Sequence, residues 1–247
     1  MKPAARDQKR LYADLAWLWP LISPPEDYVS EAGEFVQAIR QHARIEVKTL
    51  LDLGCGGGHN DHTLRQHFQV TGVDLSEEML GLARRLNPDV AYQVGDMRSL
   101  RLGQVFDAVL IADSIDYMLT EADLRAAFAT AYAHLRPGGV FVTYAEETRE
   151  HFEQNGTYLH THSQSDLEVV MLENYYDPDP ADSTYEMTFV YLIRQAGRLR
   201  IETDQHVGGI FSLPTWSRLL QEVGFEVKVL DFEEGGCPMF VGLRPIN

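Results

Sequence analysis

A short apolar strand that runs directly into a glycine-rich turn constrains the fold of this 247-residue chain more than any other feature. Residues 49–58 read Thr-Leu-Leu-Asp-Leu-Gly-Cys-Gly-Gly-Gly. The leucines are too continuous for a half-exposed strand, so we place this segment at the centre of a parallel sheet. The glycines allow backbone angles closed to other residues and let a ligand approach the main chain. We expect a helix over residues 60–68 whose free N–H groups point at the turn, as in a nucleotide-type site.

The charge balance and the cysteines exclude several classes of protein. The formal net charge of -16 repels phosphate backbones, and we find no basic patch of the kind that nucleic-acid binding requires. Cys55 and Cys237 have neither a disulfide nor a metal-type spacing. Residues 1–6 are too polar for a signal peptide, and no apolar run approaches the roughly 18 residues that span a membrane. We therefore predict a cytoplasmic protein.

A regular alternation of strands and helices follows the glycine turn. We predict strands over residues 47–53, 70–74, 91–94, 106–112 and 140–144, with helices between them that Ser76 and the Thr120/Asp123 pair cap. This rhythm indicates an α/β fold with a doubly wound parallel sheet. Ligands bind such sheets beyond the carboxyl ends of the strands. Four acids, Asp52, Asp74, Asp96 and Asp113, lie at or near those ends and predict a site there.

The segments on either side of this core differ from it. Leu11, Leu15, Leu18 and Trp19 predict a helix over residues 8–19. A second helix begins near residues 27–28, with an apolar stripe of Val29, Ala32, Phe35, Val36 and Ile39. Residues 157–211 alternate like antiparallel strands, and a helix over 215–223 with strands over 225–231 and 239–243 closes the chain. We therefore predict an N-terminal helical lid (1–45), a core (46–145 and 212–247) and an inserted β subdomain (146–211).

The glycine spacing narrows the ligand. A dinucleotide site needs Gly-x-Gly-x-x-Gly, but His59 stands where the third glycine belongs. A P-loop ends in Gly-Lys-Ser or Gly-Lys-Thr, which is absent here. What is left is a glycine turn with an acid, Asp74, about 20 residues on, and a carboxylate there suits the two hydroxyls of a ribose.

These motifs together resemble those of class I S-adenosylmethionine-dependent methyltransferases. The matching segments are Leu-Asp-Leu-Gly-Cys-Gly-Gly-Gly (51–58), Gly-Val-Asp-Leu-Ser (72–76), Gly-Asp-Met (95–97), Phe-Asp-Ala-Val (106–109) and Leu-Arg-Pro-Gly-Gly (135–139). The resemblance implies a Rossmann-like mixed sheet of seven strands that ends in an antiparallel hairpin. It also implies that Asp74 binds the ribose of the methyl donor, that Asp96 meets the adenine, and that residues 54–58 hold the methionine part. The donor-binding residues predicted in this way are Asp52, Gly54, Cys55, Gly56, Asp74, Leu75, Met79, Asp96, Met97, Ala112 and Asp113.

A narrower resemblance is to the N,N-dimethyltransferases that act on nucleotide-linked amino sugars in antibiotic biosynthesis. It rests on Leu-Tyr-Ala-Asp (11–14), Asp-Tyr (27–28), the β insertion that leads to His206-Val207 and Phe211, and the ending Gly-Gly-Cys-Pro-Met-Phe-Val-Gly (235–242). In that family an N-terminal tyrosine, here Tyr12, lies near the donor. Where such enzymes often carry a histidine after the fourth strand, this chain has Tyr117. That departure leaves the acceptor and any base open.

Methyl transfer is an in-line displacement, so alignment of the reactants and exclusion of water supply most of the catalysis. We predict Tyr12 and Tyr117 as the residues that position the acceptor, with Asp116, Glu146 and His151 as further candidates. No metal is expected, because His59 and His62 have no convincing third ligand. His160 and His162 lie on the same side of a predicted strand. They either line an acceptor pocket or lie on a solvated face of the sheet, and we prefer the second interpretation. Cys55 is interpreted as a small filler rather than a nucleophile.

The function predicted from the sequence is methyl transfer to a small molecule, an amine such as an amino sugar. O-methylation of a small acceptor, a non-catalytic S-adenosylmethionine-binding protein and an NAD-dependent oxidoreductase are the alternatives; the missing third glycine argues against the last. We expect no nucleic-acid or membrane partner, and a homodimer through the β insertion is one further expectation.

Overall fold

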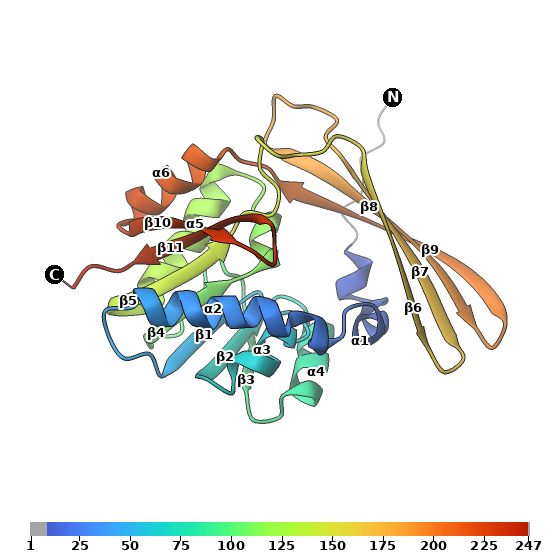
Figure 1. Ribbon diagram of the computed structural model, residues 1–247, viewed down its shortest axis with the longest axis horizontal. Coiled ribbons are helices and arrows are strands. Elements are labelled where there is room, and N and C mark those ends of the chain that lie inside the picture. The colour runs from blue at the N-terminus through green and yellow to red at the C-terminus, as the bar shows by residue number, and fades with distance from the viewer. Residues whose placement is uncertain (1–8, 247) are drawn as a thin grey trace.

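A seven-stranded mixed sheet carries the glycine turn at its centre (Figure 1). The structure is a computed structural model, and it describes residues 9–246. The strand order is β10-β11-β5-β4-β1-β2-β3. The bounds are β1 (Thr49–Leu53), β2 (Gln69–Asp74), β3 (Ala91–Val94), β4 (Phe106–Ile111), β5 (Leu135–Tyr144), β10 (Glu226–Phe232) and β11 (Cys237–Leu243). Strands β1 to β5 are parallel, and β10 and β11 form the antiparallel hairpin at one edge, as predicted.

Helices cover both faces of this sheet, which confirms the doubly wound arrangement (Figure 1). One face carries α2 (Val29–His42), α3 (His59–Leu64) and α4 (Glu77–Leu86), and the other carries α5 (Glu121–His134) and α6 (Leu213–Val223). The predicted caps are present: Ser76 accepts from the Met79 N–H and Thr120 from the Asp123 N–H. These side chains pair backbone donors that a helix leaves free in its first turn.

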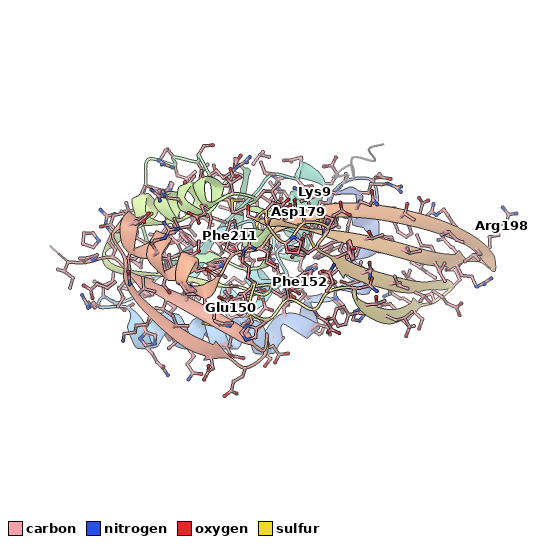
Figure 2. All side chains as sticks on the ribbon, turned by 90° about the horizontal axis from the view of Figure 1, so that it is seen from above. Lys9, Glu150, Phe152, Asp179, Arg198 and Phe211 are labelled. Carbon is pink, nitrogen blue, oxygen red and sulfur yellow. The ribbon has the colours of Figure 1, made fainter. Side chains whose placement is uncertain are left out.

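A second, four-stranded antiparallel sheet lies between β5 and α6 in the chain, and we call it the insertion sheet. It consists of β6 (Gly156–Gln164), β7 (Leu167–Tyr176), β8 (Thr184–Gln195) and β9 (Arg198–Gly209), in that order. It projects from the core, and Arg198 lies at its free tip (Figure 2). The inserted β layer is therefore confirmed, while the exact division of the chain into lid, core and insertion stays a prediction.

The expected helix over residues 8–19 is wrong. Residue 8 lies outside the described residues, and the remainder forms two short 3-10 helices, Arg10–Tyr12 and Ala16–Leu18, followed by α1 (Trp19–Ile22). Backbone groups that a continuous helix would use are bonded to other elements instead. The Leu11 N–H donates to Asp204 (2.7 Å), and the Tyr12 carbonyl accepts from Ser76 Oγ (2.5 Å). We call residues 10–19 the N-terminal strap, because they join the insertion sheet to the seven-stranded sheet.

Three smaller expectations also need correction. Val29 is 53% exposed and does not belong to the buried stripe of α2, which follows a 3-10 turn over Pro25–Tyr28. Helix α3 ends at Leu64 rather than Phe68, since the chain turns there to enter β2. Strand β5 begins at Leu135 and not at residue 140. The Arg-Pro-Gly-Gly run lies inside it as a shift of register against β4.

Candidate functional site

A cavity of about 600 Å³ opens beyond the carboxyl ends of the parallel strands, and we call it the edge cavity. All eleven residues predicted to bind the donor line it: Asp52, Gly54, Cys55, Gly56, Asp74, Leu75, Met79, Asp96, Met97, Ala112 and Asp113. They come from four consecutive strand ends. The sheet topology therefore brings together residues that span 62 positions of the sequence, from Asp52 to Asp113.

The glycine turn forms the floor of the edge cavity. Gly54 has a φ of 82°, a backbone conformation that side chains rarely adopt, and its N–H donates to the Val73 carbonyl (2.6 Å). A Cβ at Gly54 would stand 1.9 Å from the Ser114 Oγ. Only glycine fits here, so the backbone itself faces the cavity and leaves room for a ligand.

Asp74 fixes the second strand end against this turn. Its carboxylate accepts from the Gly56 N–H (2.9 Å) and from the Ser76 N–H (2.8 Å). Burial raises the pKa of Asp74, although these backbone N–H groups act in the opposite direction. Each carboxylate oxygen can accept more than one hydrogen bond, so the group keeps acceptor capacity toward the cavity for a diol.

Two further acids of the edge cavity have contrasting environments. Asp96 is bound by the guanidinium of Arg98 (2.7 Å), which lowers its pKa and keeps it ionised. Asp52 is buried beside Asp61, and burial followed by the charge of Asp61 raises the pKa of Asp52 well above its ordinary value. Burial raises the pKa of Asp61 to about 6. Two buried acids this close favour a shared proton, which stabilises the strand end without a metal or an arginine.

A second, smaller cavity of about 290 Å³ lies against the insertion sheet, and we call it the insertion cavity. Four residues line both cavities: Tyr12, Trp19, Asp113 and Tyr117. The predicted acceptor-positioning tyrosines therefore stand where the two spaces adjoin. Their hydroxyls are 2.9 Å apart and hydrogen-bonded to each other.

The insertion cavity is lined by acids and aromatic rings. Its carboxyl groups are Asp113, Asp116, Glu146 and Glu173, and among the described residues that line it there is no lysine or arginine. Asp116 is only 7% exposed, and its Oδ1 has no hydrogen-bond partner among the described residues. Burial, then the charge of Asp113, raises the pKa of Glu146 to about 8. A positively charged ligand stabilises the ionised form of these acids, so such a cavity favours a cationic ligand.

Two buried residues continue the line of hydrogen bonds behind the tyrosines: His206, which the sequence singled out only through the family resemblance, and Asp204, which it did not single out. The Tyr117 hydroxyl lies 2.7 Å from His206 Nδ1, and His206 Nε2 lies 2.9 Å from Asp204 Oδ2. Both residues project inward from β9, with exposed fractions of 1% for His206 and 0% for Asp204. The sequence contains one signal for them: Asp204 and His206 are two positions apart in a strand, so their side chains lie on the same face of the sheet.

The other singled-out residues have varied outcomes. Asp116 and Glu146 line the insertion cavity, whereas His151 lines neither cavity and contacts Thr148. His160 and His162 both line the insertion cavity, which agrees with the acceptor-pocket alternative, while the side chain of His160 is also 50% exposed to solvent. Their strand, β6, is the edge of the insertion sheet and faces α1, which the sequence pattern did not reveal.

Comparison with known proteins identifies the class. Residues 50–139 match the family described as a methyltransferase domain. The fold resembles that of DesVI from Streptomyces venezuelae (TM-score 0.83, 28% identity, 94% of this chain and 96% of that one). It also resembles a SAM-bound amino pentose methyltransferase from Micromonospora echinaspora (TM-score 0.80, 28% identity, 88% and 91%). The chain is an S-adenosylmethionine-dependent methyltransferase.

Within this class, the sequence is similar to sugar N-methyltransferases. It is 29% identical to the dTDP-3-amino-3,4,6-trideoxy-α-D-glucopyranose N,N-dimethyltransferase of Streptomyces venezuelae, over 88% of this chain and 92% of the relative. It is also 29% identical to the dTDP-4-amino-2,3,4,6-tetradeoxy-D-glucose N,N-dimethyltransferase of Saccharopolyspora spinosa, over 88% and 87%. At this coverage the similarity extends beyond residues 50–139 and into the insertion sheet.

Proposed function

We propose that this enzyme transfers the methyl group of S-adenosylmethionine to the amine nitrogen of an amino sugar. The observation that carries the proposal is the junction of the two cavities. The edge cavity has a glycine floor in which a Cβ at Gly54 would collide with Ser114, and Tyr12 and Tyr117 lie between this cavity and an acid-lined space. The relatives are named for amino-sugar methylation, which agrees with a cavity that favours a cationic acceptor.

The roles of the residues follow from this arrangement. Bound S-adenosylmethionine supplies a methyl group already activated by a positive sulfur. The glycine turn around Gly54 would hold its methionine part, Asp74 its ribose and Asp96 its adenine. Tyr12 and Tyr117 would place the acceptor nitrogen in line with the carbon–sulfur bond, which lowers the barrier by orientation. The aromatic wall would keep water away from the reacting atoms.

Paired assays test this function. S-adenosylhomocysteine should raise the melting temperature of the protein and NAD should not, because the third dinucleotide glycine is replaced by His59. Methyl transfer is then measured with an amino sugar and with the matched sugar that carries a hydroxyl at the same carbon. Transfer to the amine supports the proposal. Transfer to the hydroxyl alone would overturn it in favour of O-methylation.

Two predictions about the surroundings of the enzyme stay proposals. Among residues 9–246 no helix is long and apolar enough to cross a membrane, and the cytoplasmic location is our prediction. Exposed apolar residues on the insertion sheet, such as Leu159 and Ile201, support the homodimer prediction. Sedimentation of the wild type and of Ile201→Lys tests it; a monomeric wild type would contradict it.

A further inference from the structure

We propose that His206, positioned by Asp204, accepts the proton of the ammonium form of the acceptor through a relay of the Tyr12 and Tyr117 hydroxyls. The inference rests on the proposed function, because it concerns an amine acceptor. It is carried by four side chains in an unbroken line, with separations of 2.9, 2.7 and 2.9 Å between successive polar atoms. The line ends at the junction of the two cavities, where Tyr12 and Tyr117 lie.

The direction of each hydrogen bond follows from the buried end. Asp204 accepts from the backbone N–H groups of Leu11 (2.7 Å) and Gln205 (2.9 Å). Burial alone raises the pKa of Asp204, but the hydrogen bonds from His206 and the backbone outweigh it, so the pKa lies below its ordinary value. Asp204 is therefore a carboxylate that can only accept. It follows that His206 carries a proton on Nε2, and in the neutral imidazole that the proposal requires, Nδ1 is an acceptor.

The remaining directions follow in turn. The Tyr117 hydroxyl must donate to Nδ1 of His206, and its oxygen then accepts from the Tyr12 hydroxyl. The proton of Tyr12 is thereby committed, and only its oxygen lone pairs face the cavities. A hydroxyl held in this way can accept a hydrogen bond from an N–H group. It cannot donate to the lone pair of an amine, which is the lone pair that must attack the methyl carbon.

The acids of the insertion cavity explain why such a relay is needed. Asp113, Asp116 and Glu146 favour the ammonium form of an amine, which has no lone pair and cannot attack. Dimethylation repeats the requirement, because the first transfer leaves a monomethyl ammonium that must lose a proton before the second. A site that attracts the cation and also reacts with it needs a proton acceptor beside the nitrogen. An ionised Glu146 is the rival acceptor, and full activity of the relay variants would favour it.

The proton transfer balances without any further reactant. One ammonium proton passes to the Tyr12 oxygen, the Tyr12 proton to the Tyr117 oxygen, and the Tyr117 proton to His206 Nδ1. The amine becomes neutral, both tyrosines stay phenols, and His206 becomes an imidazolium paired with the Asp204 carboxylate. Burial raises the pKa of Tyr12, so it conducts the proton and does not ionise itself.

Other charged groups face this line of residues and belong to its electrostatics. Lys9 Nζ lies 4.3 Å from the centre of the Tyr117 ring. The carboxyls of Asp74 and Asp113 act on Tyr12, that of Asp116 acts on Tyr117, and the phenols of Tyr185 and Tyr191 lie close to the same groups. Because several charged groups act on this line, a comparison of two acceptors in one protein is more decisive than a pH profile alone.

The experiment uses the full enzyme and two forms of one sugar. One form carries an alkyl amine, which is protonated at pH 7, and the other carries a weakly basic aminooxy group, which is already neutral. For His206→Gln we expect kcat with the amine to fall about 10²-fold, the scale of general acid–base catalysis. With the aminooxy sugar kcat should change less than threefold. Raising the pH should restore the variant on the amine, roughly tenfold per pH unit below the amine pKa.

Control variants separate the relay from folding. Tyr117→Phe keeps the ring and removes one hydroxyl, so it should show the same difference between acceptors even if His206→Gln folds poorly. His134 is as buried as His206, with hydrogen bonds to Thr130 and Leu102, and it lines neither cavity. His134→Gln should leave the ratio of the two activities unchanged.

The possible outcomes distinguish a failure of the relay from a failure of the proposed amine methylation. Equal losses on the two acceptors, or no loss on the amine, would overturn the relay while leaving amine methylation intact. A wild-type enzyme that methylates neither nitrogen would overturn the proposed function first, and the relay with it. A loss confined to the protonated acceptor supports the proposal.

Discussion

Removal of the Asp74 carboxylate tests the assignment of the donor in the edge cavity. The group is fixed by the Gly56 and Ser76 N–H groups and has acceptor capacity left for two ribose hydroxyls. A hydrogen bond to a charged group contributes about 1.5 kcal/mol or more. Two such bonds amount to about 3 kcal/mol, so Asp74→Ala should raise the Kd for S-adenosylhomocysteine by about 10²-fold.

Calorimetric titration measures this change, and a donor analogue isolates its cause. Asp74→Ala also leaves two backbone N–H groups without their partner, which loosens the turn for every ligand. An S-adenosylhomocysteine analogue without the two ribose hydroxyls cannot lose the diol contacts, so its change in Kd reports only the loosening of the turn. The two ligands and the two proteins therefore form a double-mutant cycle that isolates the diol contacts. Asp89→Ala, which removes an exposed carboxylate bound to Arg65, is the control and should leave both affinities unchanged. An unaltered Kd for S-adenosylhomocysteine in Asp74→Ala would refute the ribose assignment.

Three further changes probe other parts of the site. Gly54→Ala should abolish measurable donor binding, because its Cβ would collide with Ser114. Gly103 also has a positive φ but open space around it, so Gly103→Ala should lower only the free energy of unfolding, by about 1–2 kcal/mol of backbone strain. Calorimetric titration measures the first effect and thermal unfolding the second. Asp61 has a pKa raised to about 6, so its contribution to stability is present below its ordinary pKa and is lost as the pH rises through 6. As the pH rises from 5 to 8, the free energy of unfolding of Asp61→Asn should therefore rise relative to that of the wild type by on the order of 2 kcal/mol, measured by urea unfolding. A difference in free energy of unfolding that stays constant with pH would contradict the shared proton with Asp52. Tyr12→Phe should reduce turnover more than donor affinity, and equal losses in both would make Tyr12 a packing residue of the donor site.

The donor half of the site could be predicted from the sequence because its signals are local. Each acid stands at or within two residues of the end of a strand, and the parallel topology alone brings strand ends to one edge. Ser76 and Thr120 cap their helices as expected, because a cap depends only on the next three residues. The eleven predicted donor residues therefore line one cavity, while their individual contacts with the donor stay predictions.

The acceptor half depends on contacts that no local pattern contains. In β9 the apolar positions Leu199 and Ile201 are 51% and 60% exposed, and the alternate positions Asp204 and His206 face inward. A hydrophobic pattern places that strand the wrong way round, since the free tip of the insertion sheet has no core beneath it. The strap presents the same difficulty, because its backbone is satisfied by residues more than 60 positions away.

The N-terminal strap also has a thermodynamic consequence. Leu11 is bonded to Asp204 on the insertion sheet and Tyr12 to Ser76 at the edge cavity, so one short segment is tied to both ligand sites. Any displacement of this segment on binding of the donor therefore changes the free energy of binding of the acceptor. Linkage requires the reverse effect to be equal, so the two affinities change by one common factor. If the two ligands prefer different conformations of residues 10–19, their binding is anticooperative, and if they prefer the same one, it is cooperative.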